Sequence, residues 1–189
     1  LVSMGGAPRA SIMLGRGEHP KAEKILGNCT VMLVIMAIIL TAVFLIWGES
    51  ILMVFGASEA TIGYALDYMR IYALGTIFVQ LALGLNAFIN AQGYAKIGMI
   101  TVAIGALCNI VLDPIFIFSM SMGVKGAALA TIISQAISSI FVVYFLTSKR
   151  SGLRIKLDNL KLDFQVILPC LALGLSPFIM QFTESVISV

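Results

Sequence analysis

An asparagine and an aspartate one helical turn apart are the residues of this sequence best suited to binding a small cation. Asn109 and Asp113 are four residues apart among apolar neighbours, a spacing that places both side chains on one face of an α-helix. Pro114 has no amide hydrogen and therefore leaves the carbonyl oxygen of Ile110 free. Carboxylate, amide and carbonyl oxygens suit a hard cation such as Na⁺, and a carboxyl group removed from water also suits a proton. The alternative role of Asp113 is to brace neighbouring helices.

Thr131 is predicted to face this pair from the next helix. A turn near Ser121 would join two antiparallel helices, with Asp113 eight residues before it and Thr131 ten residues after it. At a rise of about 1.5 Å per residue, both lie roughly 12–15 Å from the turn and so at a similar depth. A threonine hydroxyl in a membrane helix also commonly bonds its own backbone, so both roles stay open. Small residues allow the two helices to approach closely, namely Gly123, Gly126, Ala127, Ala128 and Ala130.

Glu184 is the other acidic candidate, because an ionisable side chain inside a membrane span is costly and often functional. It follows Gly174 and Pro177, a combination that favours a kinked helix. If its span begins near Cys170, Glu184 lies near the middle of the membrane. If the span begins at Phe164, Glu184 lies toward the outer face, and the argument for function weakens.

Other polar side chains in the apolar runs have two uses open to them. Asn86, Gln135 and Gln181 are candidates for lining a substrate cavity, although interhelical hydrogen bonding is the commoner use of amides in membranes. Asp67 and Arg70 are three residues apart and are predicted to form an ion pair on one helix near the membrane edge.

The motifs of soluble enzymes are missing from the sequence. The glycine-rich segment around Gly15 lacks the Gly-Lys-Ser/Thr ending of a phosphate loop, and His19 has no partner at metal-ligand spacing. Cys29, Cys108 and Cys170 are spaced neither as a disulfide framework nor as a zinc site. We therefore expect no enzyme activity, no resident metal and no cofactor other than a coupling ion.

The elements that position these residues are predicted to be membrane helices. Hydrophobic residues make up 60% of the 189 residues, charged residues 11%, and the mean hydropathy is +1.04. Such a chain cannot hide its apolar surface in water, and its apolar runs have the length of membrane-spanning helices, about 20 residues. The fold class is therefore predicted to be an all-α integral membrane bundle. Five spans are expected, at residues 28–47, 71–95, 97–122, 126–148 and from 166 onward.

Lysine and arginine predict the orientation of these spans. They collect before the first span, after the second and after the fourth, whereas the two intervening loops, residues 48–59 and 119–125, hold one lysine and no arginine. Cytoplasmic loops collect such residues, so loops 5–24 and 147–163 are predicted to be cytoplasmic. The net charge of +3 then belongs to these loops and indicates no nucleic-acid partner.

Three motifs together resemble the multidrug and toxic compound extrusion (MATE) family. They are the segments from Gly5 to Gly17, from Asn109 to Phe118 and from Met122 to Gln135, and the likeness extends over essentially the whole chain. The resemblance implies a twelve-helix transporter of two six-helix lobes. The chain would then run from the end of helix 2 into helix 7 as part of a longer protein. Residues 1–163 would belong to the first lobe and residues 164–189 would begin the second.

The resemblance also implies a function and a set of site residues. Proteins of this kind export amphipathic, often cationic compounds in antiport with H⁺ or Na⁺, and the family's first-lobe cation site falls on Asn109, Asp113 and Thr131. An acidic coupling residue of the second lobe falls on Glu184, while the family's acidic residue on helix 1 lies outside this chain. We therefore expect a monomeric transporter in the plasma membrane, with small molecules and the lipid bilayer as its partners.

Two other functions stay open at this point. One is a flippase of lipid-linked precursors or polysaccharides, which has a related architecture but would need a strongly basic central cavity. Lysine and arginine are scarce within the predicted spans, which disfavours this function. The other is a membrane scaffold that transports nothing and needs no buried carboxylate.

Overall fold

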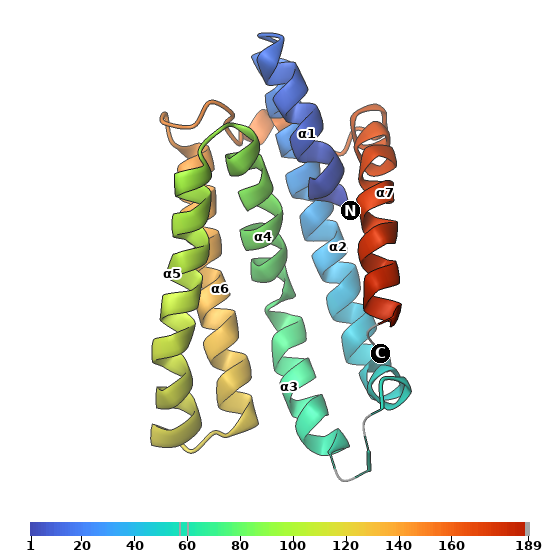
Figure 1. Ribbon diagram of the computed structural model, residues 1–189, viewed down its shortest axis with the longest axis vertical. Helices are drawn as coiled ribbons and strands as arrows, with labels where there is room; N and C mark the ends of the chain where they lie inside the picture. The colour runs from blue at the N-terminus through green and yellow to red at the C-terminus, as the bar shows by residue number, and fades with distance from the viewer. Residues whose placement is uncertain (57, 60, 188–189) are drawn as a thin grey trace.

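The chain folds into a bundle of antiparallel helices (Figure 1). The computed structural model describes residues 1–56, 58–59 and 61–187, and the side chains of all of these except 185–187. No strand occurs in these ranges, which confirms the all-α prediction. The elements are α1 (Val2–Gly15), α2 (His19–Val54), α3 (Ile62–Leu74), α4 (Thr76–Ala91), α5 (Ala95–Pro114), a π-helical turn (Ile115–Ser119), α6 (Val124–Thr147), a 3-10 turn (Leu157–Asn159) and α7 (Phe164–Ile187).

The number of membrane spans agrees with the prediction. Four helices are long and apolar enough to cross a membrane, namely α2, α5 with its π-helical turn, α6 and α7. The fifth span is the pair α3 and α4, which together meet the same test. The boundaries differ most for α2, which has 36 residues and continues well beyond the predicted segment 28–47 at both ends.

The second span, predicted over residues 71–95, is bent. It begins at Ile62, and α3 meets α4 at an angle of 57° across Gly75. The side chain of Ile132 in α6 lies against this glycine, so a β-carbon at position 75 would be 2.3 Å from the Ile132 Cγ1 atom. The bend therefore brings the chain close to α6 at a point where only glycine fits.

The predicted cytoplasmic loop 5–24 is wrong in its extent. Helix α1 occupies most of it and α2 begins at His19, so the connection consists of Arg16, Gly17 and Glu18. Gly17 has a φ of +76°, a conformation that glycine adopts without strain, and this allows the tight turn. Pro20 stands in the first turn of α2, where its missing amide hydrogen costs no helical hydrogen bond. The other predicted loop, 147–163, is largely irregular, as expected.

The helices pack in two groups that are joined by the contacts of α4 with α1 and α2. Helices α4, α5 and α6 pack on one another on one side, while α7 packs on α1 and α2 on the other (Figure 1). Within the described chain α7 touches neither α4, α5 nor α6. Its contact with α1 is made backbone to backbone, since a β-carbon on Gly5 would overlap the carbonyl oxygen of Cys170 and one on Gly174 that of Leu1.

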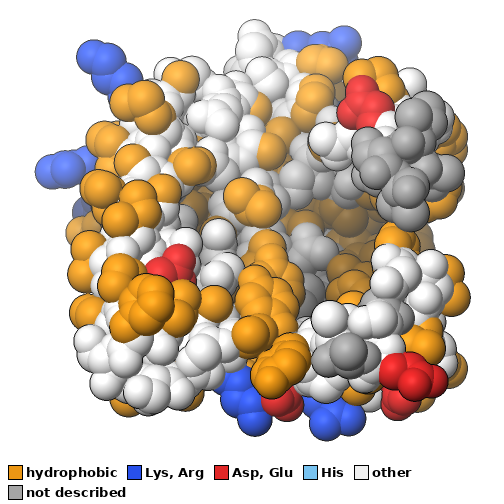
Figure 2. Space-filling view, turned by 60° about the horizontal axis from the view of Figure 1, so that its bottom comes forward, with side chains coloured by type: hydrophobic (Ala, Val, Ile, Leu, Met, Phe, Trp, Pro, Cys, Tyr) orange, Lys and Arg blue, Asp and Glu red, His pale blue; other side chains and the backbone are white. Residues whose placement is uncertain are grey.

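Much of the outer surface is apolar. Ile46, Phe118 and Tyr144 are 68%, 76% and 70% exposed, as expected for side chains that face lipid. Hydrophobic side chains are spread across the face seen in Figure 2, where most of the visible lysine and arginine side chains lie near the edges.

The segment between α6 and α7 is bound to the ends of α2 and α4. Lys156 forms an ion pair with the buried carboxylate of Glu23, at 2.5 Å, and the backbone amide of Asp163 donates to the Asn28 side chain. At the end of α4, the side-chain oxygen of Gln92 accepts hydrogen bonds from Ser151 and from the backbone amide of Leu153. These contacts hold the connection against the bundle over most of its length.

Candidate functional site: a polar pocket between three helices

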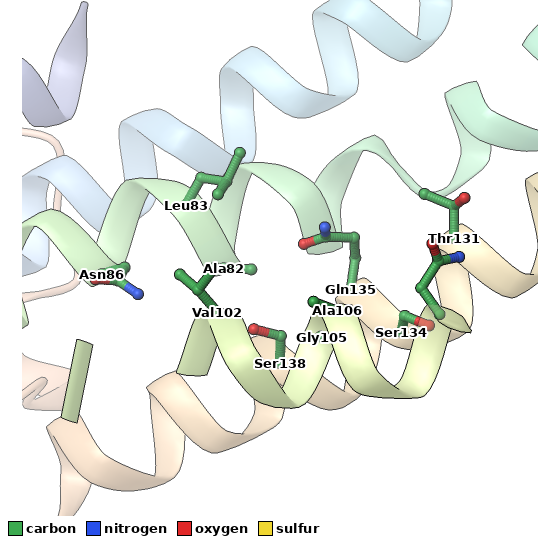
Figure 3. Close-up of a pocket in the computed structure, with 11 residues that line it drawn as sticks. Ala82, Leu83, Asn86, Val102, Gly105, Ala106, Thr131, Ser134, Gln135 and Ser138 are labelled. Atoms are coloured by element: carbon green, nitrogen blue, oxygen red, sulfur yellow. The ribbon is translucent and has the colours of Figure 1, made fainter. Parts of the chain in front are cut away.

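A pocket of about 180 Å³ lies between α4, α5 and α6 (Figure 3). In Figure 3, Thr131 and Gln135 lie toward one end of the pocket and Asn86 toward the other. The apolar part of the wall includes Ala82, Leu83 and Val102. Its polar lining comes from Asn86, Asn109, Thr131, Ser134, Gln135 and Ser138.

Small residues position the walls of this pocket. Gly105 of α5 faces Ser138 of α6 closely enough that an added β-carbon would be 3.5 Å from the Ser138 Cβ atom. The Ser138 hydroxyl donates a 2.8 Å hydrogen bond to the backbone carbonyl of Thr101, which ties α6 to α5. Toward the turn between these helices, Gly126 lies directly against the backbone of Phe116. The predicted close approach of the two helices is thus confirmed at Gly126.

Asn109 and Asp113 interact as their spacing predicts. The Asn109 side-chain nitrogen donates a hydrogen bond of 3.2 Å to the Asp113 carboxylate, and both side chains are partly buried. Asn109 lines the pocket, and Asp113 is connected to it through this bond. Among the described residues no lysine, arginine or histidine nitrogen lies within 4.0 Å of the Asp113 carboxylate. An acidic group without a basic partner, next to an amide, has the composition of a site for a mobile cation.

Thr131 reaches the same pocket from α6. Its hydroxyl donates a 2.9 Å hydrogen bond to the backbone carbonyl of Ala127, as membrane threonines commonly do. A hydroxyl oxygen that donates its hydrogen retains lone pairs that can bind a cation or accept a further hydrogen bond. The structure therefore brings Asn109 and Thr131 to one pocket with Asp113 one turn away.

Two candidates for the substrate cavity line this pocket in different ways. The Asn86 side chain is buried and donates to the Gly98 carbonyl and to the Thr101 hydroxyl, and it accepts a bond from Asn90. Its amide thus joins α4 to α5. Gln135 lines the same pocket and makes no hydrogen bond within the described part of the chain.

Glu184 and Gln181 lie elsewhere, on α7. Both side chains are exposed, and α7 packs on α1 and α2, away from the three helices of the pocket. The span of α7 begins at Phe164, so Glu184 stands near its far end, about 30 Å along the helix at 1.5 Å per residue. The helix thus begins at Phe164, the start for which the sequence predicts that Glu184 lies toward the outer face.

The predictions from the sequence missed two residues of the pocket and assigned one ion pair to the wrong partner. Ser134 and Ser138 line the pocket, and their spacing from Thr131, three and seven residues, marks one face of a helix. The predicted pair of Asp67 and Arg70 is wrong, because the Asp67 carboxylate lies 3.2 Å from the ammonium group of Lys125 at the start of α6. A contact between helices replaces one within a helix.

Two cysteines also meet in space. Cys29 of α2 and Cys170 of α7 are both fully buried neighbours, and the Cys170 thiol donates a hydrogen bond of 3.2 Å to the backbone carbonyl of Val166. Because the two cysteines are far apart in the sequence, their spacing did not predict this contact. Gly6 of α1 leaves space for the Cys29 side chain, since a β-carbon at position 6 would be 2.5 Å from the Cys29 sulfur.

A bundle of apolar helices with a polar pocket inside it defines a polytopic helical membrane protein. Residues 1–115 match the family model described as MatE, and the chain belongs to this family. It is 30% identical to the multidrug export protein MepA of Staphylococcus haemolyticus over 95% of the chain, which spans 40% of that protein. The chain thus spans well under half the length of this relative.

Solved structures of the family have the same fold. The chain superposes on an outward-facing multidrug resistance MATE transporter with a TM-score of 0.89 at 26% identity, covering 98% of this chain and 41% of that one. An inward-facing structure of the same kind gives a TM-score of 0.85 at 26% identity, covering 92% and 40%. The family resemblance expected from the sequence motifs is confirmed.

Proposed function

We propose that the chain is part of a secondary active transporter that exports drugs or other amphipathic, often cationic compounds in antiport with H⁺ or Na⁺. The observation that carries this proposal is the Asp113 carboxylate, which is hydrogen-bonded to Asn109 and has no basic partner in the described chain. A carboxylate of this kind can take up and release one cation per transport cycle, and the relatives' names support a drug as the counter-substrate.

Within the proposed cycle each pocket residue has a distinct task. Asp113 holds the coupling ion, with the oxygens of Asn109 and Thr131 as its neutral ligands. Gln135 and Asn86 present polar groups to the substrate, beside the apolar wall of Ala82, Leu83 and Val102. Glu184 and Gln181 would serve the second lobe, because α7 lies apart from the pocket.

The pocket lining favours a cationic substrate over a diphosphate lipid. No lysine or arginine occurs among the described residues that line it, whereas a carrier of diphosphate headgroups would need such charges. As an exporter the protein would work as a monomer in the plasma membrane, with residues 16–18 and 148–163 on the cytoplasmic side, where their basic residues belong. It would transport without catalysing a reaction.

The first test of this proposal is dye efflux from cells that make the full-length protein. Asp113→Asn removes the charge and keeps the shape, and we expect it to reduce efflux at least tenfold at unchanged expression. Asp158→Asn, an exposed carboxylate in the segment before α7, is the matched control and should retain full efflux. Unchanged efflux and ion dependence in both Asp113→Asn and Glu184→Gln would falsify the coupling role.

The coupling ion is distinguished in vesicles that contain the purified full-length protein. A sodium gradient at constant pH and a pH gradient without sodium are imposed separately, and uptake of the same dye is followed. Export driven by only one gradient identifies its ion, and Asp113→Asn should abolish that component. Transport that needs neither gradient would contradict antiport.

A further inference from the structure

A second pocket, of about 380 Å³, lies between α1, α2 and the first turn of α7, and we call it the basic pocket. It is at the end of the bundle where the α1–α2 turn and the α6–α7 segment lie, the upper end in Figure 1. Four of its lining side chains are cationic and one is anionic, and the other three are apolar. These residues are Arg9, Arg16, Lys21, Lys24, Glu18, Met13, Ile25 and Val166.

Two of the four cations already have partners. Lys21 lies 2.6 Å from the Glu18 carboxylate, and Lys24 lies 2.6 Å from that of Asp163. The hydrogen bond from Lys21 lowers the pKa of Glu18, and that from Lys24 lowers the pKa of Asp163. Both carboxyl groups are therefore ionised at neutral pH and offset the two lysines.

Neither Arg9 nor Arg16 has a carboxylate within 4.0 Å in the described chain; the charge of Arg16 acts on Glu18 from further away, and Arg9 neighbours the Cys170 thiol. The Nη1 atom of Arg9 is buried and makes no hydrogen bond there. A buried donor without a partner costs about 1–3 kcal/mol, so a bound anion that satisfies the guanidinium group would be favoured. Guanidinium groups bind phosphate oxygens in pairs, which makes phosphate the best-matched anion.

The rest of the wall suits an acyl chain. Ile25 is buried, Met13 and Val166 are partly buried, and all three are apolar. Basic residues are typical of the cytoplasmic side of a membrane protein, so we expect this end of the bundle at the cytoplasmic membrane surface, where lipid phosphates and the first methylene groups of the acyl chains lie. A free phosphate compound would leave the apolar side of the pocket unused.

We propose that the basic pocket binds the phosphate group of an anionic phospholipid of the cytoplasmic leaflet, with Arg9 and Arg16 as its ligands. The pocket lies between the end of the first-lobe helices α1 and α2 and the start of α7, so a bound lipid would bridge them. This binding does not depend on whether the protein transports drugs.

The test is native mass spectrometry of the delipidated full-length protein titrated with phosphatidylglycerol or phosphatidylcholine. We expect wild-type protein to prefer phosphatidylglycerol and the variant Arg9→Gln/Arg16→Gln to bind it about thirtyfold more weakly, as follows from about 1 kcal/mol for each of the two arginines. Arg9→Lys/Arg16→Lys keeps the charge and should retain part of the preference. The control Lys149→Gln/Arg150→Gln removes equal charge from an exposed segment outside the pocket.

Each remaining outcome overturns the proposal. Equal binding of the two lipids, or an equal loss in the control variant, would mean that surface charge alone attracts lipid. Inorganic phosphate that stabilises wild-type protein against heat while phosphatidylglycerol does not would assign the pocket to a free phosphate compound. If the glutamine variant fails to fold, the lysine variant is compared with the control. A preference for phosphatidylglycerol that is no weaker in the lysine variant than in the control would then overturn the proposal.

Discussion

At the scale of single residues, the two amides of the polar pocket differ in what they bond. The Asn86 amide nitrogen joins α4 to α5 and its oxygen accepts a bond from Asn90 within α4, whereas Gln135 makes no hydrogen bond within the described chain. Two side-chain amide groups in one pocket can therefore differ in role: one stabilises the structure, and the other remains available to a ligand.

Replacing these amides should separate the two roles. Asn86→Ala removes the hydrogen bonds from Asn86 to Gly98 and Thr101, which stay bonded to each other, and leaves the Asn90 amide without its acceptor. We therefore expect this change to lower the free energy of unfolding by about 1–3 kcal/mol. Gln135→Ala should change that free energy by less than about 0.5 kcal/mol and alter which dyes are exported. Unfolding of the purified full-length protein by SDS measures the first effect, and efflux of several dyes measures the second. Equal destabilisation by both changes would show the distinction to be wrong.

The part of the site that could be predicted from the sequence is the part determined by spacing along a single helix. Asn109 and Asp113 could be paired from the sequence because four residues along a helix determine their relative position. Asp67 pairs with Lys125, and Cys29 meets Cys170, only because helices far apart in sequence pack together. Spacing along the chain contains no information about such contacts.

At the scale of elements, the segment between α6 and α7 is fixed to α2 by a buried charge. The Glu23 side chain is 8% exposed and its partner Lys156 is 51% exposed. A buried carboxylate that loses its partner is strongly unfavourable, while removal of both charges together costs much less.

A double-mutant cycle should detect this coupling. We expect Lys156→Met to destabilise the full-length protein by about 1–3 kcal/mol, because it leaves Glu23 buried and unpaired. The double variant Glu23→Gln/Lys156→Met should regain most of that loss, and Lys161→Met, in the same segment, is the control. Heat-induced unfolding gives the stability, and protease cleavage within residues 148–163 reports detachment of the segment. Additive effects of the two single changes would contradict the coupling.

The helices themselves were predictable because apolar runs of membrane length have few alternatives. The bend at Gly75 was not, since it depends on Ile132, which lies 57 residues further along the chain. The α1–α2 connection was also misjudged, because the basic and polar residues of α1 resemble a loop in composition. Their packing against α2, α4 and α7 makes the segment helical.

At the scale of the whole molecule, α7 is joined to the other helices mainly through α1 and α2. The Cys29 and Cys170 thiols meet across this contact, beside the glycines of α1. In the proposed transporter α7 begins the second lobe, so a covalent bond at this point would tie the two lobes together.

Oxidation should produce this bond. We expect copper phenanthroline to join Cys29 and Cys170 in the full-length protein, detected by mass spectrometry as a linked pair of peptides that dithiothreitol separates. Cys108→Ser should leave the link intact and Cys29→Ser should abolish it. Efflux should fall after oxidation and recover after reduction, because the lobes can no longer move apart. Linked peptides that contain Cys108 would contradict the observed contact.

The contact between Gly75 and Ile132 also constrains how this sequence can change over time. A β-carbon at position 75 would lie 2.3 Å from the Ile132 side chain, so a lineage can acquire alanine there only after, or together with, a smaller residue at position 132. The order of substitution is thereby restricted, and the two positions should covary among descendants. Such a correlated pair would reveal from sequences alone which members of the family share the bent helix.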